Sequence, residues 1–274
     1  MKVQDIEFAR SKDYSLLLTL YLPDRPNGHG IVMVHGGAWT ANDRLSPYVL
    51  NDALAKRGMV VASLDFRCGP VFQHPTASAD IAAGIRFVKS QAEEWGIARD
   101  KIGLIGSSSG GHLVLFVALQ PDHEFHRTTD YIRKDEGSIQ SATVSYVIAL
   151  WPVSNPLYRY HHAIDTNRPE LLRAHNGYFT GVDQMHEASI QHVLETAQHS
   201  HLPPAMIVQP GEDTNVPQEM TLDLLRAYQQ AKGSVDYRFM PGLPHGFAYQ
   251  DSEATTECEG YIWDFIQQQL KQSS

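Results

Sequence analysis

A short glycine- and serine-rich tract, Gly106-Ser107-Ser108-Ser109-Gly110-Gly111, constrains the fold of this chain more than any other feature. It follows an apolar run at residues 101–105 and precedes a second apolar run at residues 112–119. A strand that turns sharply into a helix strains the central residue of the turn and leaves little room beside it. Glycine is therefore needed two positions before and two positions after that residue. Only Ser108 meets this condition, so the tract predicts a strand, a sharp turn and a helix, with Ser108 as a candidate nucleophile.

A turn of this composition can also bind phosphate or merely connect two elements. The tract does not end in Gly-Lys-Ser or Gly-Lys-Thr, as a P-loop does, and it lacks the G-x-G-x-x-G spacing of dinucleotide sites. A phosphate-binding loop is therefore disfavoured, and we expect no cofactor.

A pair of glycines follows an earlier buried strand, which we predict at residues 30–34. The chain continues there as His35-Gly36-Gly37-Ala38-Trp39. The N–H groups of Gly36 and Gly37, with that of Ser109 at the start of the next helix, would hold the negative charge of a tetrahedral intermediate. Alone, two glycines would indicate only a tight turn. Beside a candidate nucleophile they predict an oxyanion hole.

A carboxylate and an imidazole follow the candidate nucleophile in the order that a hydrolase sheet requires. Asp213 and His245 each lie in a loop directly after a predicted strand. His245 would accept the proton of Ser108 and later return a proton to the leaving group. Asp213 would fix the tautomer of the histidine and stabilise its cationic form. Glu212 is a weaker alternative for the acid.

Composition excludes several kinds of partner. The chain has 274 residues, a formal net charge of −9 and a pI near 5.8, which argue against a nucleic acid or an anionic membrane. The N-terminus lacks an apolar signal core, and no apolar stretch is long enough to span a bilayer, so we expect a cytoplasmic protein. The length suits a single domain over residues 1–274, and self-association is left open.

Two cysteines and fourteen histidines raise the question of disulfides and metals. Cys68 and Cys258 are too few for a disulfide framework, and we expect two unpaired structural thiols. No histidines form an HExxH motif or a set with zinc spacing, so we predict no metal site. The closest groupings are His123 with His126, His161 with His162, and His199 with His201.

The chain resembles the α/β-hydrolase superfamily, near the hormone-sensitive-lipase-like esterases, the feruloyl and acetylxylan esterases and the kynurenine formamidases. The resemblance covers nearly the whole chain, and it implies a mostly parallel sheet with helices on both faces. Ala38 stands where the lipase pattern has a third glycine, and Asp213 follows Gly211 by two residues where relatives often have three. Beyond the residues above, the resemblance rests on Asp65-Phe66-Arg67, His74-Pro75 leading to Asp80, Trp95-Gly96-Ile97, and Gly110-Gly111-His112-Leu113.

The alternation of strand and helix patterns independently favours the same α/β architecture. We predict further strands at residues 59–64, 144–150, 205–209 and 235–240, and a helix at residues 78–94. Asp65, Arg67 and Asp80 are expected to form an ion-paired scaffold that braces the loops. Residues 121–140 are strongly charged and are predicted to form a solvated excursion.

The alternation gives way to a polar, aromatic-rich segment at residues 152–202. The resemblance implies a small cap over the active site at this position. Tyr178 and Phe179 in this segment, with Trp39 beside the glycine pair, are candidates for contact with the substrate.

Together these residues predict a carboxylesterase that cleaves small carboxylic esters through an acyl-enzyme on Ser108. The alternative enzyme is an arylformamidase, an amide hydrolase with the same catalytic residues. A third hypothesis is a ligand-binding protein that derives from a hydrolase and has lost turnover. It is disfavoured because Ser108, Asp213 and His245 are all present.

Overall fold

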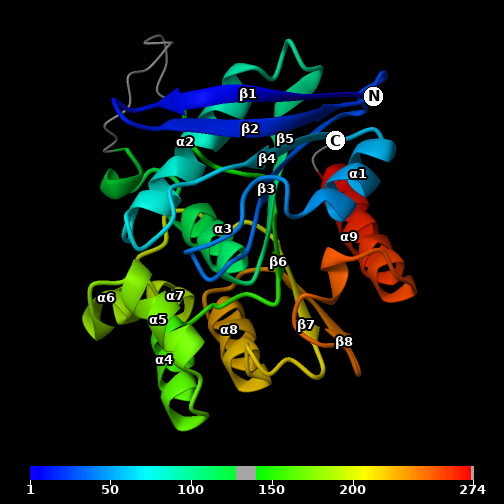
Figure 1. Ribbon diagram of the computed structural model, residues 1–274. Helices are drawn as coiled ribbons and strands as arrows, with labels where there is room; N and C mark the ends of the chain where they lie inside the picture. The colour runs from blue at the N-terminus through cyan, green and yellow to red at the C-terminus, as the bar shows by residue number, and fades with distance from the viewer. Residues whose placement is uncertain (128–139, 273–274) are drawn as a thin grey trace.

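A computed structural model describes residues 1–127 and 140–272 as a twisted sheet with helices on both faces (Figure 1). The strand order in the eight-stranded sheet of these residues is β1-β2-β4-β3-β5-β6-β7-β8. Neighbouring strands from β4 to β8 pair in parallel, which confirms the predicted mostly parallel sheet. The strands are β1 Lys2–Arg10, β2 Ser15–Leu22, β3 Gly28–Val34, β4 Val60–Leu64, β5 Ile97–Ser107, β6 Val147–Leu150, β7 Ala205–Pro210 and β8 Val235–Met240.

The two N-terminal strands, β1 and β2, pair antiparallel with each other, and β2 pairs antiparallel with β4. Helices cover the parallel part of the sheet and also fill the segment between β6 and β7. The helices are α1 Tyr48–Lys56, α2 Thr76–Ser90, α3 Ser109–Leu119, α4 Pro156–Asp165, α5 Pro169–Tyr178, α6 Val182–Glu187, α7 Ile190–Glu195, α8 Gln218–Gln230 and α9 Glu253–Gln272.

Side chains that alternate along each strand divide the core into two layers. Val32 and Val34 of β3 face the layer that α2, α3 and α8 cover. Ile31 and Met33, between them in the sequence, face the layer that α1 and α9 cover. Because both faces are buried, the parallel strands are apolar throughout rather than alternately polar and apolar.

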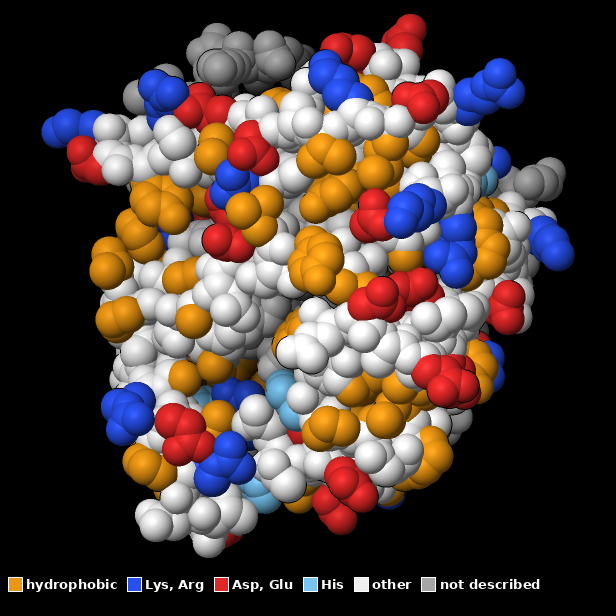
Figure 2. All heavy atoms as spheres, turned by 45° about the vertical axis from the view of Figure 1, so that its right-hand side comes forward, with side chains coloured by type: hydrophobic (Ala, Val, Ile, Leu, Met, Phe, Trp, Pro, Cys, Tyr) orange, Lys and Arg blue, Asp and Glu red, His pale blue; other side chains and the backbone are white. Residues whose placement is uncertain are grey.

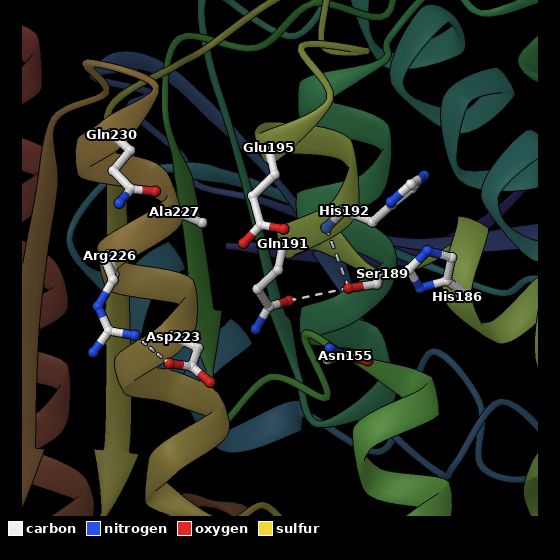
Figure 3. A pocket seen from close by; sticks show the side chains of 10 residues that line it. All are labelled: Asn155, His186, Ser189, Gln191, His192, Glu195, Asp223, Arg226, Ala227 and Gln230. Carbon is white, nitrogen blue, oxygen red and sulfur yellow. Dashed lines mark hydrogen bonds and ion pairs between the residues drawn. The ribbon is translucent and has the colours of Figure 1, made fainter.

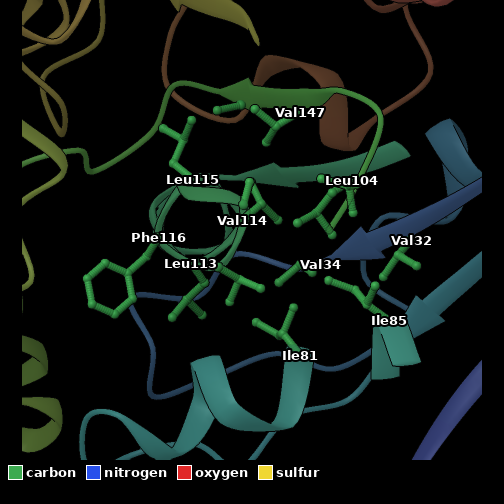
Figure 4. Packing of buried hydrophobic residues seen from close by; sticks show 14 of the residues in the cluster. Val32, Val34, Ile81, Ile85, Leu104, Leu113, Val114, Leu115, Phe116 and Val147 are labelled. Carbon is green, nitrogen blue, oxygen red and sulfur yellow. The ribbon is translucent and has the colours of Figure 1, made fainter. Parts of the chain in front are cut away.

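Helix α3 lies at the centre of the first layer and is buried along its whole length. It packs between the sheet and α2: Leu113 lies beside Val34 and Ile81, and Val114 lies toward Leu104 (Figure 4). A helix that is apolar on all sides is stable only where other elements enclose it. The helix that begins at the predicted turn is therefore held rigidly by the core.

The structure shortens one predicted helix, shows helices in the segment that follows β6, and places part of the charged excursion outside the described residues. Helix α2 begins at Thr76 and ends at Ser90, and residues 91–94 form a turn instead of the helix predicted there. Residues 152–202 contain helices α4 to α7, which group beside α3 and α8 (Figure 1). Most of the charged excursion, residues 128–139, lies outside the described residues.

The predicted scaffold of ion pairs forms with one change of partner. The guanidinium of Arg67 pairs with the carboxylate of Asp80 at 2.9 Å, and both side chains are buried. Asp65 pairs with Arg44 at 3.0 Å and not with Arg67. In the described residues, no helix is long and apolar enough to cross a membrane.

Candidate active site

The turn between β5 and α3 has the conformation that its glycines predict. Ser108 has φ 55° and ψ −120°, a strained conformation for a residue other than glycine. A Cβ atom on Gly106 would lie 2.5 Å from the carbonyl oxygen of Gly110. A Cβ atom on Gly110 would lie 2.3 Å from the carbonyl oxygen of His35. Both positions therefore need glycine. The turn places the Ser108 hydroxyl within hydrogen-bond distance of His245.

Ser108, His245 and Asp213 form a continuous chain of hydrogen bonds. The Oγ atom of Ser108 lies 3.0 Å from Nε2 of His245. The Nδ1 atom of the same ring lies 2.8 Å from Oδ2 of Asp213. With Nδ1–H donating to the carboxylate, Nε2 is unprotonated and accepts the serine proton. The structure thus brings together three residues that are 137 and 32 positions apart in the sequence.

Asp213 is oriented by its own loop. Its side chain is enclosed, and its Oδ1 atom accepts the N–H groups of Asn215 and Val216, each at 2.8 Å. This leaves Oδ2 to face His245. Glu212, the rival acid of the sequence analysis, is exposed, and among the described residues it forms no hydrogen bond or ion pair with the histidine. Of these two neighbouring carboxylates, only that of Asp213 is hydrogen-bonded to the ring in the described residues.

The loops of the acid and the base are joined by their backbones. The N–H of Gly211 donates to the carbonyl of Met240 at 2.8 Å, and the N–H of Glu212 donates to the carbonyl of Leu243 at 2.9 Å. Parallel pairing of β7 with β8 brings the two loops to the same edge of the sheet. The distance between the acid and the base is therefore fixed by the sheet.

The glycine pair lies against the nucleophile. A Cβ atom on Gly36 would lie 3.3 Å from Cβ of Ser108, so the loop touches the turn directly. The N–H groups of Gly36 and Gly37 donate to no backbone carbonyl in residues 1–127 and 140–272. The N–H of Ser109, at the first position of α3, has no acceptor within its helix. These three donors remain proposed oxyanion-hole residues.

Two buried histidines hold the glycine loop in place. The ring of His35 stacks on Phe66, and its Nδ1 atom lies 2.7 Å from the carbonyl oxygen of Gly36. His112 of α3 accepts the indole N–H of Trp39 at Nδ1 and donates from Nε2 to the carbonyl of Ala188. Burial lowers the pKa of each of these two histidines to about 4. Both rings are therefore neutral at physiological pH, as this donor and acceptor pattern of His112 requires.

The three aromatic residues predicted to contact the substrate are enclosed in the protein. Trp39 and Tyr178 are 0% exposed and Phe179 is 1% exposed. The rings of Trp39 and Tyr178 stack with centroids 5.5 Å apart, and the edge of Phe179 meets Trp39 at 5.1 Å. Rings that are covered on all sides present no surface to a ligand. We therefore correct this prediction: these aromatic side chains attach the segment that follows β6 to the glycine loop.

Tyr249 is a polar contact of the turn that the sequence analysis did not identify. Its hydroxyl lies 2.9 Å from Oγ of Ser107, and a Cβ atom on Gly36 would lie 2.7 Å from that hydroxyl. Burial raises the pKa of Tyr249, so the hydroxyl keeps its proton at neutral pH. It lies four residues beyond His245, and only this proximity in sequence would have pointed to it.

A separate pocket of about 270 Å³ lies between α7 and α8 (Figure 3). His186 and His192 lie together on one side of it, with ring centroids 4.3 Å apart, and the ion pair of Asp223 with Arg226 lies on the other. None of the three residues of the hydrogen-bonded chain lines it. The pocket is therefore distinct from the candidate active site.

Other candidate sites from the sequence analysis do not assemble. Among the described residues, no group of three or more His, Cys, Asp or Glu side chains is arranged to hold a metal ion. Cys68 and Cys258 are both free thiols, and burial raises the pKa of each to about 11 and about 12, respectively. Neither is activated as a nucleophile.

Comparison with curated proteins identifies esterases. Esterase LipC of Mycobacterium tuberculosis is 24% identical over 87% of this chain and 58% of its own length. An acetylxylan esterase of Xylanibacter ruminicola is 24% identical over 87% of this chain and 45% of its own length. An arylesterase of Saccharolobus solfataricus is 35% identical over 39% of this chain and 36% of its own length. The chain thus spans between about a third and three fifths of the length of these relatives.

Comparison with solved structures establishes the fold. A thermophilic esterase of Thermogutta terrifontis, Est2, with propionate bound superposes with a TM-score of 0.76. The match covers 97% of this chain and 94% of the esterase, at 22% sequence identity. The BD-FAE family matches residues 18–228, which include Ser108 and Asp213. The chain therefore belongs to the BD-FAE family and has the α/β-hydrolase fold.

Proposed function

We propose that this protein is a carboxylesterase that hydrolyses small carboxylic esters through an acyl-enzyme on Ser108. The chain of hydrogen bonds from Ser108 through His245 to Asp213 is the observation that carries the proposal. A serine hydroxyl is a weak nucleophile at neutral pH, and an adjacent oriented base is what activates it. The curated relatives with these similarities carry the names of esterases, which favours an ester over a formamide.

The reaction follows from the positions of the donors and acceptors. As Ser108 Oγ attacks the ester carbonyl, Nε2 of His245 accepts its proton, and the carbonyl oxygen becomes negatively charged. The N–H groups of Gly36, Gly37 and Ser109 would stabilise that oxygen. Collapse of the intermediate breaks the bond to the alcohol, which takes the proton from His245. Water then attacks the acyl-enzyme by the same route and releases the acid.

The solved relatives suggest a range of acyl groups for the first assays. Est2 of Thermogutta terrifontis has been solved with propionate and with butyrate bound. We therefore propose short acyl chains as the starting substrates, and 4-nitrophenyl acetate, propionate and butyrate are suitable probes.

The decisive experiment removes the nucleophile. Ser108→Ala should lower kcat for these esters by roughly four to six orders of magnitude while the protein stays folded. Ser107→Ala is the matched control, because it removes a hydroxyl from the same turn and should cost no more than about tenfold. A serine-directed fluorophosphonate should add to the peptide that contains Ser108, as measured by mass spectrometry of the wild type and the variants.

Three outcomes would contradict the proposal. Full activity in Ser108→Ala would exclude an acyl-enzyme at this residue. Loss of activity in Ser107→Ala, together with labelling of Ser107 in the wild type, would move the nucleophile by one position. Hydrolysis of an aryl formamide at a higher kcat/KM than any ester would replace the ester by an amide as the substrate.

A further inference from the structure

Arg159, on helix α4, is the most completely buried arginine beside the candidate active site. Its side chain is among the largest fully buried ones in the described residues, and the residue is 1% exposed. The guanidinium lies over the ring of Trp39, with its carbon 5.2 Å from the ring centroid. Trp39 follows the glycine pair and donates its backbone N–H to Ser109 Oγ. Arg159 is therefore placed against the loop that meets the nucleophile.

The guanidinium has no hydrogen-bond partner in the described residues. Its Nε and Nη2 atoms are enclosed and unsatisfied. The third nitrogen, Nη1, also has no partner in the described residues but is not among the fully enclosed atoms, so it is the nitrogen of the guanidinium that keeps some exposure. Figure 2 shows a hollow in the lower half of the drawn face where basic and histidine side chains lie side by side.

In the part of the chain that the structure describes, no acidic side chain neutralises the charge of Arg159 by direct contact. Asp213 is near enough to raise the pKa of Arg159, yet the two form no ion pair in the described residues. Burial is the larger effect and lowers that pKa to about 10, so the side chain is still charged at neutral pH. Burial, and to a smaller extent the charge of Arg159, lowers the pKa of two buried histidines, His112 and His175. Both rings are neutral. Within residues 1–127 and 140–272, the charged group contacts the face of Trp39 and no counter-ion.

A buried, unpaired cation is unfavourable for the fold. Burying an ionised group costs free energy unless partners compensate it, and apolar replacements of buried charges are often neutral or stabilising. Residues that carry such a cost beside an active site are usually kept for binding. A planar guanidinium with free N–H groups is the side chain that best recognises a carboxylate.

We propose that Arg159 binds a carboxylate carried by the substrate, so that the protein hydrolyses esters in which the acid or the alcohol part bears a second, free carboxylate. The inference rests on the proposed esterase function and specifies its substrate class. The carboxylate would accept from Nη1 and replace the missing counter-charge. The ester group would then lie at Ser108, with the charged end of the substrate held beside Trp39.

The test compares pairs of esters that differ by one carboxylate. In the acyl pair, 4-nitrophenyl hydrogen glutarate is compared with 4-nitrophenyl pentanoate. In the alcohol pair, 4-acetoxybenzoate is compared with 4-methylphenyl acetate. The measured quantity is the ratio of kcat/KM for the carboxylated ester to that for the neutral ester, in the wild type and in each variant. The pair that responds shows which half of the substrate carries the charge.

The expected change follows from the loss of one charged hydrogen bond. Arg159→Met should lower the ratio in one of the two pairs by about ten- to a hundredfold. Arg159→Lys keeps a charge without the planar fork and should fall between the wild type and Arg159→Met. Arg173→Met is the matched control, because it removes an exposed arginine from the neighbouring helix α5 and should leave both ratios unchanged.

Stability separates a binding role from a structural one. If the charge is held for a substrate, Arg159→Met should unfold at a temperature no lower than that of the wild type. A large drop in that temperature with unchanged ratios would show that Arg159 is structural, and would overturn the inference. Equal ratios in Arg159→Met and the wild type for both pairs would overturn it as well.

The neutral esters distinguish this inference from the proposed function. If the wild type cleaves neutral esters and Arg159→Met changes neither ratio, only the carboxylate specificity fails. If the wild type cleaves no ester of either pair, the esterase function itself fails, and the inference fails with it.

Discussion

Two buried aspartates, Asp80 and Asp213, have similar surroundings and different consequences. Asp80 is 0% exposed, accepts the backbone N–H of Arg67 and pairs with its guanidinium. Asp213 accepts two backbone N–H groups and pairs with His245. Each carboxylate is thus buried and paired with a basic side chain. The difference lies in the partner, because the far nitrogen of His245 reaches Ser108 Oγ, whereas Arg67 packs over the ring of Phe72.

This comparison shows that a buried ion pair does not by itself mark an active site. An ion pair that packs in the core, away from any reacting atom, can change only the stability of the fold. An ion pair in which one member is also hydrogen-bonded to a reactive atom can change the rate of the reaction. Substitutions in the two pairs should therefore separate activity from stability.

The largest effect should come from Asp213→Asn. The N–H groups of Asn215 and Val216 hold an oxygen at the Oδ1 position, so the new amide nitrogen would face His245 Nδ1. The ring would then carry its proton on Nε2 and could not accept one from Ser108. We expect kcat for ester hydrolysis to fall about 10⁴-fold. A fall of less than about tenfold, with the fold intact by circular dichroism, would contradict the assignment of the acid.

The next effect should appear in stability and not in activity. Asp80→Asn removes the carboxylate charge that pairs with the buried Arg67 guanidinium, which should cost about 3 to 5 kcal/mol in the free energy of unfolding. Denaturant titration measures this loss, while kcat per folded molecule should stay within a few-fold of the wild type. The double variant Arg67→Met with Asp80→Leu is the control, because it removes both charges and should recover much of the stability. No recovery would mean that the pair itself contributes the stability.

A smaller effect concerns the stability of the fold at acidic pH. Burial lowers the pKa of His74, His126 and His175 to about 3. In the unfolded chain a histidine titrates near pH 6.5, so below that pH the unfolded state binds protons that the folded state excludes. The stability that these residues contribute is complete above pH 6.5 and is lost progressively as pH falls towards 3.

We therefore expect the free energy of unfolding to fall by up to about 1.4 kcal/mol per pH unit for each such histidine below pH 6.5. Denaturant titration between pH 7 and pH 4.5 measures the slope. His126→Gln should reduce the slope by about one proton, since it removes one buried titrating group. A stability that is constant over this pH range would refute the assignment of these rings as buried and neutral.

The smallest effect should come from Glu212→Gln. Glu212 is exposed and lies beside Asp213 in the same loop. Because it does not reach His245, we expect kcat/KM to change by less than about threefold. A loss as large as that of Asp213→Asn would show that the two neighbouring carboxylates had exchanged roles.

The sequence predicts the parallel core of this protein well because the relevant signals are local. A buried strand that ends in a glycine turn is visible in a few adjacent residues, and such runs locate β3, β5 and β7; the glycine turn also marks the end of β8, which is only partly buried. The antiparallel pair β1 and β2 was not predicted. Its residues alternate between polar and apolar over only part of their length, and β1 is only partly buried. An edge strand with one covered face gives a weaker signal than a strand buried on both faces.

The same limit explains the errors at the site. The positions of Ser108, Asp213 and His245 could be inferred because each follows a strand of a parallel sheet, and such strands end at one edge. The burial of Tyr178 and the isolation of Arg159 depend on how helices α4 to α7 pack on Trp39. A local sequence pattern does not predict which side of an aromatic ring is buried or whether a guanidinium forms a hydrogen bond.

The close approach of Gly110 to His35 has a consequence for how new specificities can arise. Because no side chain fits between the glycine loop and the start of α3, these two segments form one incompressible unit. Few substitutions in that unit could change the substrate preference without loss of catalysis. Helices α4 to α7 contact it through a few side chains, such as Arg159 and Tyr178 on Trp39. Variation that creates new enzymes on this scaffold should therefore accumulate in those helices, and directed evolution should begin there.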